Sequence, residues 1–419
     1  MRFLRAIGTF AAVVVVSAAV TVGALIGTDS VLALGGAPSL QQVWPEVASE
    51  RSTPEPPPRI VEFTVAAVGD LMTHGPQIDS AKTASGYDFN PCFAPVAPRI
   101  SAADLAIGNL ETTLSGADRG YSGYPQFNAP DAYAEALVAA GFDVLTTANN
   151  HNLDRGPTGL VRTLEVLDGL GALHTGTART AEEAATTLVT EVKGVKIAIL
   201  AYTYGMNGFT APSDKPWMVN VLNVGKMTEA VKAARALEVD LVIVSIHNGV
   251  EYQRQPSASQ RQVEEAMIEA GADIVLGSHP HVIQPMETIE VAEADGSTRT
   301  AFIIHSLGNF VSNQRERYRN TGLILEFGME KNLRTDKTTL VSVEYVPVWV
   351  DDVDATGKEH RVLPIRDVLD DPAYPGVSAD DRARMQQAWD DTTTHLGGTG
   401  EASDDPGALV FYGKPLARQ

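Results

Sequence analysis

The sequence predicts a layered α/β fold with a mostly parallel sheet and helices on its outside. The first observation is that apolar, β-branched segments alternate with amphipathic segments over much of the chain. The second is that a glycine directly follows several amphipathic segments, as Gly141, Gly171 and Gly271 do. Glycine commonly ends a helix, and repeated alternation of strand and helix is typical of parallel sheets.

Each predicted element has a local signal. The first strand spans 61–68, where β-branched residues are frequent and Gly69-Asp70 ends the run. The first long helix spans 130–140, because Pro130 suits the first turn and Gly141 stops it. Similar signals predict strands at 104–107, 142–147, 195–202, 240–246, 274–276, 301–305, 321–327 and 339–350. They predict further helices at 158–170, 226–237, 257–270 and 380–391.

Composition limits the class of partner. The chain has 419 residues, of which 44% are hydrophobic and 20% charged, and this is a globular profile. Its formal net charge of −20 repels nucleic acid, so no nucleic-acid partner is expected. An anionic substrate needs a local cation, which a bound metal supplies. The single cysteine, Cys92, excludes an intrachain disulfide and a cysteine-based zinc site, and we interpret it as a small buried hydrophobe.

The N-terminal segment predicts export. Arg2 and Arg5 precede an apolar run over 6–26, and Val31-Leu32-Ala33 offers a cleavage site after Ala33. Residues 1–33 are therefore a signal peptide if they are cut, or an N-terminal membrane anchor if they are retained. Both alternatives place the rest of the chain at the extracytoplasmic face, membrane-anchored or secreted.

Three further regions follow the export segment. Residues 34–59 carry four prolines near their end and predict an extended, Pro-rich linker. Residues 60–330 hold the alternation of strands and helices and form the predicted main domain. Residues 331–419 predict a C-terminal strand that packs on the core, followed by a polar extension in which we find no chemistry.

Potential metal ligands recur at or just past the carboxyl ends of predicted strands. Because parallel strands bring these ends to one edge of a sheet, we expect the side chains to meet there. Carboxylate, amide and imidazole groups favour one or two divalent ions, with Mn, Zn or Fe as alternatives. The predicted ligands are Asp70, Glu111, Asn150, His247, His279 and His281.

The separate signals differ in strength. An ordinary turn also explains Asp70 and Glu111, and His247 by itself resembles a core histidine. His279-Pro280-His281 is the strongest signal, because two closely spaced histidines are costly to bury without partners. Taken together, the residues favour a metal site over these alternatives, because unrelated turns and core histidines are not expected to occur at the same sheet edge.

Six ordered motifs within residues 61–328 resemble the CapA family, which is associated with poly-γ-glutamate capsule synthesis. The motifs are Gly69-Asp70-Leu71-Met72, Asn109-Leu110-Glu111, Ala148-Asn149-Asn150-His151, His247-Asn248-Gly249-Val250-Glu251-Tyr252, Gly277-Ser278-His279-Pro280-His281-Val282 and Ser306-Leu307-Gly308-Asn309-Phe310. That family is similar in turn to calcineurin-like metallophosphatases. The resemblance implies a metallophosphatase-like α/β sandwich with a phosphoesterase-like hydrolase site.

The resemblance also implies a role for each matching residue. Asp70 matches the first metal-binding aspartate, and Glu111 takes the place of the aspartate that bridges two metals. Asn150 matches the amide ligand, and His151 matches the histidine that assists the substrate or leaving group. Asn150 and His151 are therefore the predicted catalytic residues. The remaining imidazole ligands are His247, His279 and His281.

One position departs from the metallophosphatase pattern. Met72 stands where those enzymes carry a histidine ligand. His74 lies four residues after Asp70 and is a candidate replacement. With no replacement, the site lacks one ligand of a two-metal centre.

Several residues beside the motifs are expected to contact substrate. For Glu251 and Tyr252 the alternative is a loop held by a buried tyrosine hydroxyl. For Asn309 the alternative is a tight glycine turn. The predicted substrate-binding residues are His74, Asn149, Glu251, Tyr252 and Asn309.

Two functions fit these residues. The first is a metal-dependent, phosphoesterase-like hydrolase, favoured by the Asn150-His151 pair. The second is a non-enzymatic component that binds a polyanion during export or tethering of the capsule polymer, favoured by Met72. In both cases the expected partners are an anionic polymer such as poly-γ-glutamate or a phosphoester, together with membrane-bound synthesis machinery.

Overall fold

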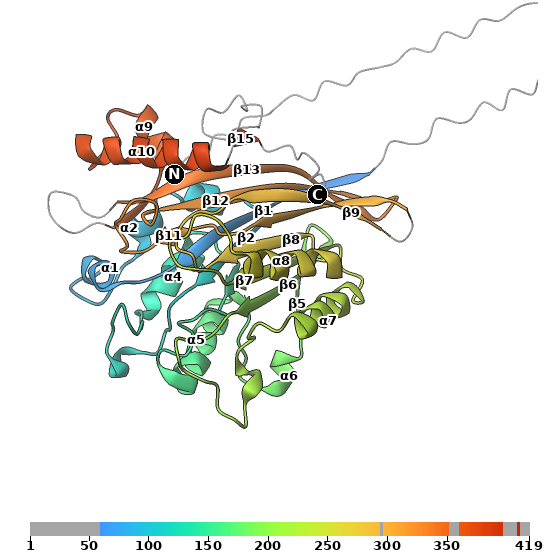
Figure 1. Cartoon of the computed structure of the whole chain (residues 1–419). Coiled ribbons are helices and arrows are strands. Elements are labelled where there is room, and N and C mark those ends of the chain that lie inside the picture. The colour runs from blue at the N-terminus through green and yellow to red at the C-terminus, as the bar shows by residue number, and fades with distance from the viewer. Residues whose placement is uncertain (1–58, 294–295, 352–359, 397–408, 411–419) are drawn as a thin grey trace, which may run out of the picture. The chain divides into compact units, whose positions relative to one another are not determined.

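The computed structural model describes residues 59–293, 296–351, 360–396 and 409–410 (Figure 1). All of them belong to the compact unit Pro57–Gln419. The predicted signal peptide or anchor and nearly all of the Pro-rich linker lie outside the described residues. Among the helices that the structure describes, none combines the length and the apolar character needed to cross a membrane.

The strands form two sheets. The first sheet has the order β14-β13-β12-β1-β2-β3-β4, with β11 beside β1 and β15 beside β13. Its parallel part is β1 (Ile60–Leu71), β2 (Leu105–Leu110), β3 (Val144–Thr146), β4 (Leu173–Thr175) and β11 (Asn309–Val311). Its antiparallel part is β12 (Thr321–Asn332), β13 (Lys337–Asp351), β14 (Arg361–Pro364) and β15 (Leu409–Val410).

The second sheet has the order β5-β6-β7-β8-β10-β9. Its four central strands are parallel and its two edge strands are antiparallel. The strands are β5 (Leu188–Val192), β6 (Val195–Thr203), β7 (Leu241–His247), β8 (Ile274–Ser278), β9 (Met286–Ala292) and β10 (Thr298–Ile304).

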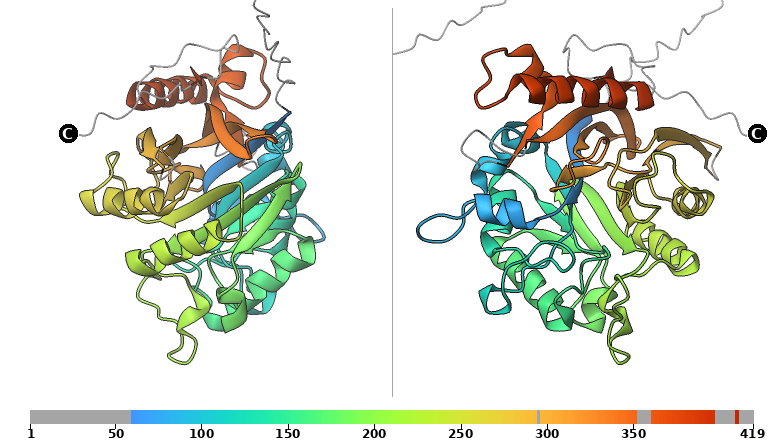
Figure 2. Two further views of the ribbon diagram at one scale, coloured as in Figure 1. Left: turned by 90° about the vertical axis from the view of Figure 1, so that its right-hand side faces the viewer. Right: turned by 60° about the vertical axis from the view of Figure 1, so that its left-hand side comes forward.

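Helices lie outside the two sheets (Figures 1 and 2). Those that precede β5 are α1 (Gly75–Ser80), α2 (Asn90–Phe93), α3 (Ala97–Ile100), α4 (Asp131–Ala139), α5 (Gly156–Leu170) and α6 (Ala181–Ala184). Those that follow are α7 (Val224–Arg235), α8 (Ala258–Ala270), α9 (Ile365–Asp370) and α10 (Ala379–Leu396). Two short 3₁₀ turns span Ala117–Arg119 and Pro216–Met218.

The main core lies between the sheets. Phe63 and Ile107 of the first sheet belong to the same buried cluster as Ile243 and Phe302 of the second. Neighbouring strand residues point the other way, so Ala66 packs in a separate cluster beneath α2 and α4. The alternation places one apolar face of each sheet against the other sheet and the opposite face against helices.

The predicted fold class, an α/β sandwich with helices outside, is confirmed. The difference is that the strands divide between two sheets rather than one, so site residues arrive from both. A strand buried on both faces is an unbroken apolar run, which does not reveal its neighbour. Short strands such as β4, β11 and β14 escaped prediction, because three or four residues are too few to show a period.

The described part of the C-terminal region packs closely on the first sheet, although a polar extension was predicted for much of it. The strand predicted at 339–350 is β13, and it pairs with β12 over most of its length. The helix predicted at 380–391 is α10, which runs from Ala379 to Leu396. Trp349 of β13 and Met385 of α10 share a buried cluster with Leu363 and Val368.

Candidate metal centre

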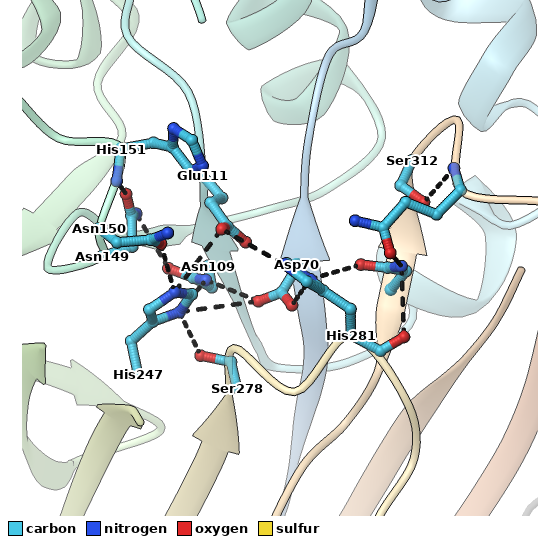
Figure 3. Close-up of polar contacts among 12 residues, drawn as sticks. Asp70, Asn109, Glu111, Asn149, Asn150, His151, His247, Ser278, His281 and Ser312 are labelled. Atoms are coloured by element: carbon cyan, nitrogen blue, oxygen red, sulfur yellow. Dashed lines mark hydrogen bonds and ion pairs between the residues drawn. The ribbon is translucent and has the colours of Figure 1, made fainter. Parts of the chain in front are cut away.

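The strand ends bring the predicted ligands together. Asp70 lies near the end of β1, and Glu111 directly follows β2. His247 is the last residue of β7, while His279 and His281 follow β8. Figure 3 shows side chains from both sheets pointing toward one another. The two sheets thus bring the predicted ligands to a common site, whereas the positional pattern predicted a single edge.

Glycines allow the backbone segments to approach closely beside this site. A Cβ atom at Gly69 would lie 1.9 Å from the carbonyl oxygen of Gly308. A Cβ atom at Gly277 would lie 2.0 Å from the carbonyl oxygen of His305. Any side chain at either position would push the segments apart, so these motif glycines set the spacing of the site.

Asp70 is fully buried and held on both sides. The side-chain amide of Asn109 donates to its Oδ1 at 2.8 Å. Its Oδ2 lies 3.0 Å from His281 Nδ1. Burial alone would raise the pKa of Asp70, but the hydrogen bond and charge of His281 outweigh burial and lower the pKa to about 2. Asp70 is therefore a fixed anion at the centre of the site.

Glu111 is also fully buried, but neither of its carboxylate oxygens has a hydrogen-bond partner. The nearest imidazole nitrogens to Oε1 are His247 Nε2 at 3.6 Å and His281 Nε2 at 4.0 Å. Burial, followed by the charge of Asp70, raises the pKa of Glu111 well above its usual range. A buried carboxylate without a partner is costly unless a cation or proton neutralises it.

His247 and Asn150 converge on the same place. Asn150 Oδ1 lies 2.7 Å from His247 Nε2, and the Asn150 amide nitrogen donates to Asn207 Oδ1 at 3.1 Å. The other ring nitrogen of His247 lies 3.0 Å from Ser278 Oγ and 3.1 Å from the Asn109 amide nitrogen. These contacts fix the imidazole plane and aim Nε2 at Asn150 and Glu111, as partners of a metal-binding histidine do.

The backbone at His279 and His281 is unusual. Both residues have positive φ, at 98° and 57°, which non-glycine residues adopt rarely. Burial, followed by the charge of His281, lowers the pKa of His279 to about 3. Its Nδ1 is buried without a hydrogen-bond partner. Strain of this kind persists where the surrounding structure holds it, and it collects at functional sites.

Two groups of side chains are arranged as a metal ion requires. Asp70, Glu111 and His247 form one group, and Glu251, His279 and His281 form the other. Within each group the candidate ligand atoms lie within 4.8 Å of one another. The unpartnered Glu111 oxygens and His279 Nδ1 fit a divalent metal, since each is a donor with no other use. The donor set therefore fits the predicted cofactor class, one or two divalent metal ions.

His151 lies beside this centre rather than within it. Its Nδ1 is 2.7 Å from Asp154 Oδ2, and its ring meets the edge of Phe127 with centroids 4.6 Å apart. The Asn149 side-chain oxygen accepts from the His151 backbone at 3.1 Å. Asn207 Nδ2 lies 3.4 Å from His151 Nε2. Asp154 thus orients the ring and leaves Nε2 toward the site, the arrangement of an acid–base histidine.

The residues predicted to contact substrate occupy different places. Asn149 donates its amide to the carbonyl oxygen of Leu110 at 2.7 Å and so holds the site loops. The ring of Tyr252 lies near that of His281, tilted by 34°, with the ring centroids 6.2 Å apart. Asn309 Oδ1 lies 3.0 Å from His281 Nδ1, so Asn309 supports a ligand. Glu251 is exposed within the second metal-binding group.

His74 is placed beside the centre but belongs to neither metal-binding group of the described residues. Its Nδ1 accepts a hydrogen bond from the Asn313 backbone at 3.2 Å, and its ring packs against Phe127. Burial, followed by the charge of His281, lowers its pKa to about 4. Met72 is buried in the core.

Four residues of the site were not among those predicted. Asn109 and Ser278 stand inside the quoted motifs, and their place beside Glu111 and His279 was the signal that could have identified them. Tyr204 packs its ring 4.4 Å from that of His279. Tyr204 and Asn207 follow β6, and the end of that strand was the available signal.

The fold is a two-sheet α/β sandwich, and carboxylate, amide and imidazole side chains gather at its strand ends. These two features define the class: a layered α/β protein with a candidate divalent-metal centre. The chain belongs to the family described as bacterial capsule synthesis protein PGA_cap, whose model matches residues 64–314. This confirms the family predicted from the six motifs.

Curated relatives agree with that assignment. The chain is 28% identical over 293 residues to the capsule biosynthesis protein CapA of Bacillus anthracis, covering 67% of this chain and 66% of that protein. It is 30% identical over 282 residues to the PGA biosynthesis protein CapA of Bacillus subtilis, covering 64% and 68%. The chain thus spans about two thirds of the length of each relative.

Solved structures that the fold matches include a putative 5'-nucleotidase from Staphylococcus aureus, with a TM-score of 0.45 and 14% identity over 79% of this chain and 58% of that one. A phosphatase from Mycoplasma pneumoniae matches with a TM-score of 0.41 and 17% identity, over 70% of this chain and 96% of that one. These scores are too low to support an argument about the site, whose chemistry is derived from this chain's own residues.

Proposed function

We propose that this PGA_cap family member is a metal-dependent, phosphoesterase-like hydrolase that acts in capsule polymer synthesis. The observation that carries the proposal is Glu111, a fully buried carboxylate whose two oxygens accept no hydrogen bond and have only imidazoles at 3.6 and 4.0 Å near Oε1. A buried carboxylate charge is tolerated where a cation neutralises it. Asp70 and His247 supply further ligand atoms within reach of the same ion.

When bound, a divalent metal supplies positive charge to a phosphoryl oxygen and lowers the pKa of water toward neutrality. The chain's own residues have separate tasks. Glu111, Asp70 and His247 would hold the ion, and Asn150 would add its side-chain oxygen to this set. His151 is oriented by Asp154 through Nδ1, and its Nε2 is the atom that would pass a proton to the leaving oxygen. Tyr204 and Phe127 pack their rings beside those of His279 and His151 and hold them in place.

A second candidate function is binding without turnover. Met72 is buried at the position where metallophosphatases carry a histidine ligand, and the nearby His74 belongs to neither metal-binding group. In this alternative the same ion holds an anionic polymer such as poly-γ-glutamate during export or tethering. The oriented His151–Asp154 pair favours hydrolysis, because a holding site has no use for a positioned proton donor.

Turnover of a generic phosphoester tests the first proposal. We expect the purified protein to hydrolyse it when loaded with Mn²⁺, Zn²⁺ or Fe²⁺, and to lose the activity in His279→Ala. His395→Ala is the control, because His395 bonds to the Arg254 carbonyl and is not a predicted ligand. A metal-loaded protein that binds polyanions yet turns over no phosphoester supports the second candidate instead.

We further propose that the chain is exported and works at the extracytoplasmic face, beside membrane-bound synthesis machinery. Support comes from Arg2, Arg5 and the apolar run over 6–26. Protease added to intact cells after removal of the cell wall should digest the protein. Protection equal to that of a cytoplasmic marker would refute export.

A further inference from the structure

A tight turn after β6 carries Asn207 to the edge of the metal centre. The backbone nitrogen of Phe209 donates to the carbonyl oxygen of Met206 at 2.8 Å, which closes a four-residue turn. Its two central residues, Asn207 and Gly208, both have positive φ, at 49° and 83°. Positive φ at both central positions, filled by Asn-Gly, is the pattern of a type I′ turn. We call residues 206–209 the Asn207 turn.

Contacts with the rest of the protein fix the place of the Asn207 turn. Just before it, the backbone nitrogen of Tyr204 donates to the carbonyl oxygen of His247 at 3.0 Å. The ring centroids of Tyr204 and His279 lie 4.4 Å apart. Met206 packs against a buried cluster that includes Leu153. Leu153 lies in the loop that also carries the predicted catalytic pair, so this cluster ties the turn to that loop.

The Asn207 side chain contacts both predicted catalytic residues. Its Oδ1 accepts from the Asn150 amide nitrogen at 3.1 Å, and its Nδ2 lies 3.4 Å from His151 Nε2. The Tyr204 hydroxyl donates to the same Oδ1 at 3.4 Å. Burial, followed by the charge of Glu251, raises the pKa of Tyr204 to about 12, and a hydrogen bond from Asn150 opposes this rise. The Asn150 amide nitrogen therefore has two acceptors on one segment, Asn207 Oδ1 and the Tyr204 oxygen.

These contacts decide which end of the Asn150 amide faces the candidate metal centre. An asparagine side chain has one oxygen that can bind a cation and one nitrogen that only donates. With its nitrogen held by Asn207, Asn150 turns Oδ1 toward His247 Nε2, 2.7 Å away. The reversed amide would direct N–H groups at the place where the ion is expected, and would repel it.

The backbone of the turn does not itself require asparagine. The hairpin turn between β5 and β6 has nearly the same backbone, with φ of 50° at Lys193 and 83° at Gly194. The Lys193 ammonium group pairs with Asp104 at the surface, 2.8 Å away. Asn207 is exposed, so its side chain fills no core. The part that Asn207 plays therefore lies in what its side chain contacts.

We propose that Asn207 is a positioning residue of the metal centre, which holds the Asn150 side chain with Oδ1 toward the ion. The inference rests on the proposed function for the presence of the ion. It adds a task for a residue outside the six motifs, which acts through Asn150 and does not itself touch the metal. Side chains that orient metal ligands typically contribute about 10- to 100-fold to metal affinity or activity.

Titration of the full, metal-free chain with Mn²⁺ or Zn²⁺ tests this role without a measurement of activity. We expect Asn207→Gly to weaken metal binding by about fivefold, because glycine keeps the turn and the Tyr204 oxygen remains as an acceptor. Asn207→Asp keeps an oxygen that accepts from Asn150, and it should bind metal at least as tightly as wild type. Lys193→Gly is the matched control, because it places glycine in a turn of the same backbone and loses only an exposed ion pair. Its metal affinity should stay within about twofold of wild type.

Unchanged metal affinity in Asn207→Gly, or an equal loss in Lys193→Gly, would overturn the role of Asn207. An equal loss in Asn207→Asp would overturn it as well, because an accepting oxygen would then not be what the site needs. A wild-type chain that binds no metal would refute the proposed function and this inference together. If the wild type binds metal and the variants differ as expected, but no phosphoester is turned over, hydrolysis is refuted and the role of Asn207 stands.

Discussion

Two of the buried histidine and carboxylate groups that the structure describes differ in how their polar atoms are satisfied. In the first, His305 Nδ1 lies 2.5 Å from Glu264 Oε2, and its Nε2 lies 3.0 Å from Glu287 Oε1. In the second, at the strand ends, both oxygens of Glu111 lack a hydrogen-bond partner. A buried histidine near carboxylates is therefore not evidence of a ligand site, whereas an unpartnered buried carboxylate is.

The pKa shifts in the two groups support the same distinction between a closed ion-pair group and a candidate ligand site. Burial lowers the pKa of His305, but hydrogen bonds to Glu264 and Glu287 outweigh burial and raise the pKa above its usual 6.5. His305 and its neighbours thus form a closed ion-pair group within the protein. Burial and the charge of Asp70 raise the pKa of Glu111. This direction is expected for a buried carboxylate that has no cation beside it.

The largest expected effect comes from Glu111→Gln, which keeps the shape of the side chain and removes its charge. We expect phosphoester turnover to fall by at least about a hundredfold, because metal ligands and their supports typically contribute on that scale. The metal-free variant should unfold at a higher temperature than the metal-free wild type, because folding no longer has to protonate or bury the Glu111 carboxylate. A lower melting temperature for the metal-free variant would contradict this description of Glu111.

Glu264→Gln should lower the stability of the protein and leave its metal content unchanged, the reverse of the effects expected for Glu111→Gln. It removes the partner of His305 and should lower the free energy of unfolding by about 2 kcal/mol, the cost of a broken buried hydrogen bond to a charged group. Metal content should not change. Chemical denaturation measures the effect, with Glu265→Gln as control, since Glu265 is the exposed neighbour on α8. Loss of metal with unchanged stability would show that the two groups had been assigned the wrong way round.

Glu251→Gln probes the second metal-binding group. Glu251 is exposed, so water screens its charge and we expect metal affinity to fall by only about fivefold. Titration of the metal-free protein with Mn²⁺ or Zn²⁺ measures this change. An effect as large as that of Glu111→Gln would mean that the group of Glu251, His279 and His281 holds the ion as tightly as the group of Glu111.

The smallest expected effect is the pH dependence of the His305 group. Because its folded-state pKa is raised, the stability from this ionisation is fully present below about pH 6.5 and is lost as the pH rises through the folded pKa. The difference in unfolding free energy between wild type and His305→Asn should therefore be larger at pH 6 than at pH 9. Denaturation curves at both pH values check the sign, and a difference that grows with pH would refute it.

Much of the centre could be predicted because its residues follow strand ends. Asp70, Glu111, Asn150, His247, His279 and His281 converge as that rule requires, although from two sheets. The division into two sheets was missed, because a strand buried on both faces carries no mark of which strand lies beside it. Asn109 and Ser278 were missed as contacts for a different reason: their partners, Asp70 and His247, are distant in sequence.

Elemental analysis of the purified protein, beside its Glu111→Gln variant, tests the central claim most directly. We predict about one or two equivalents of a divalent metal in the wild type and substoichiometric metal in the variant, with both proteins folded. Wild-type protein that stays metal-free after incubation with Mn²⁺, Zn²⁺ and Fe²⁺, or a variant that retains the full metal content, would contradict the assignment of the strand-end group as a metal centre.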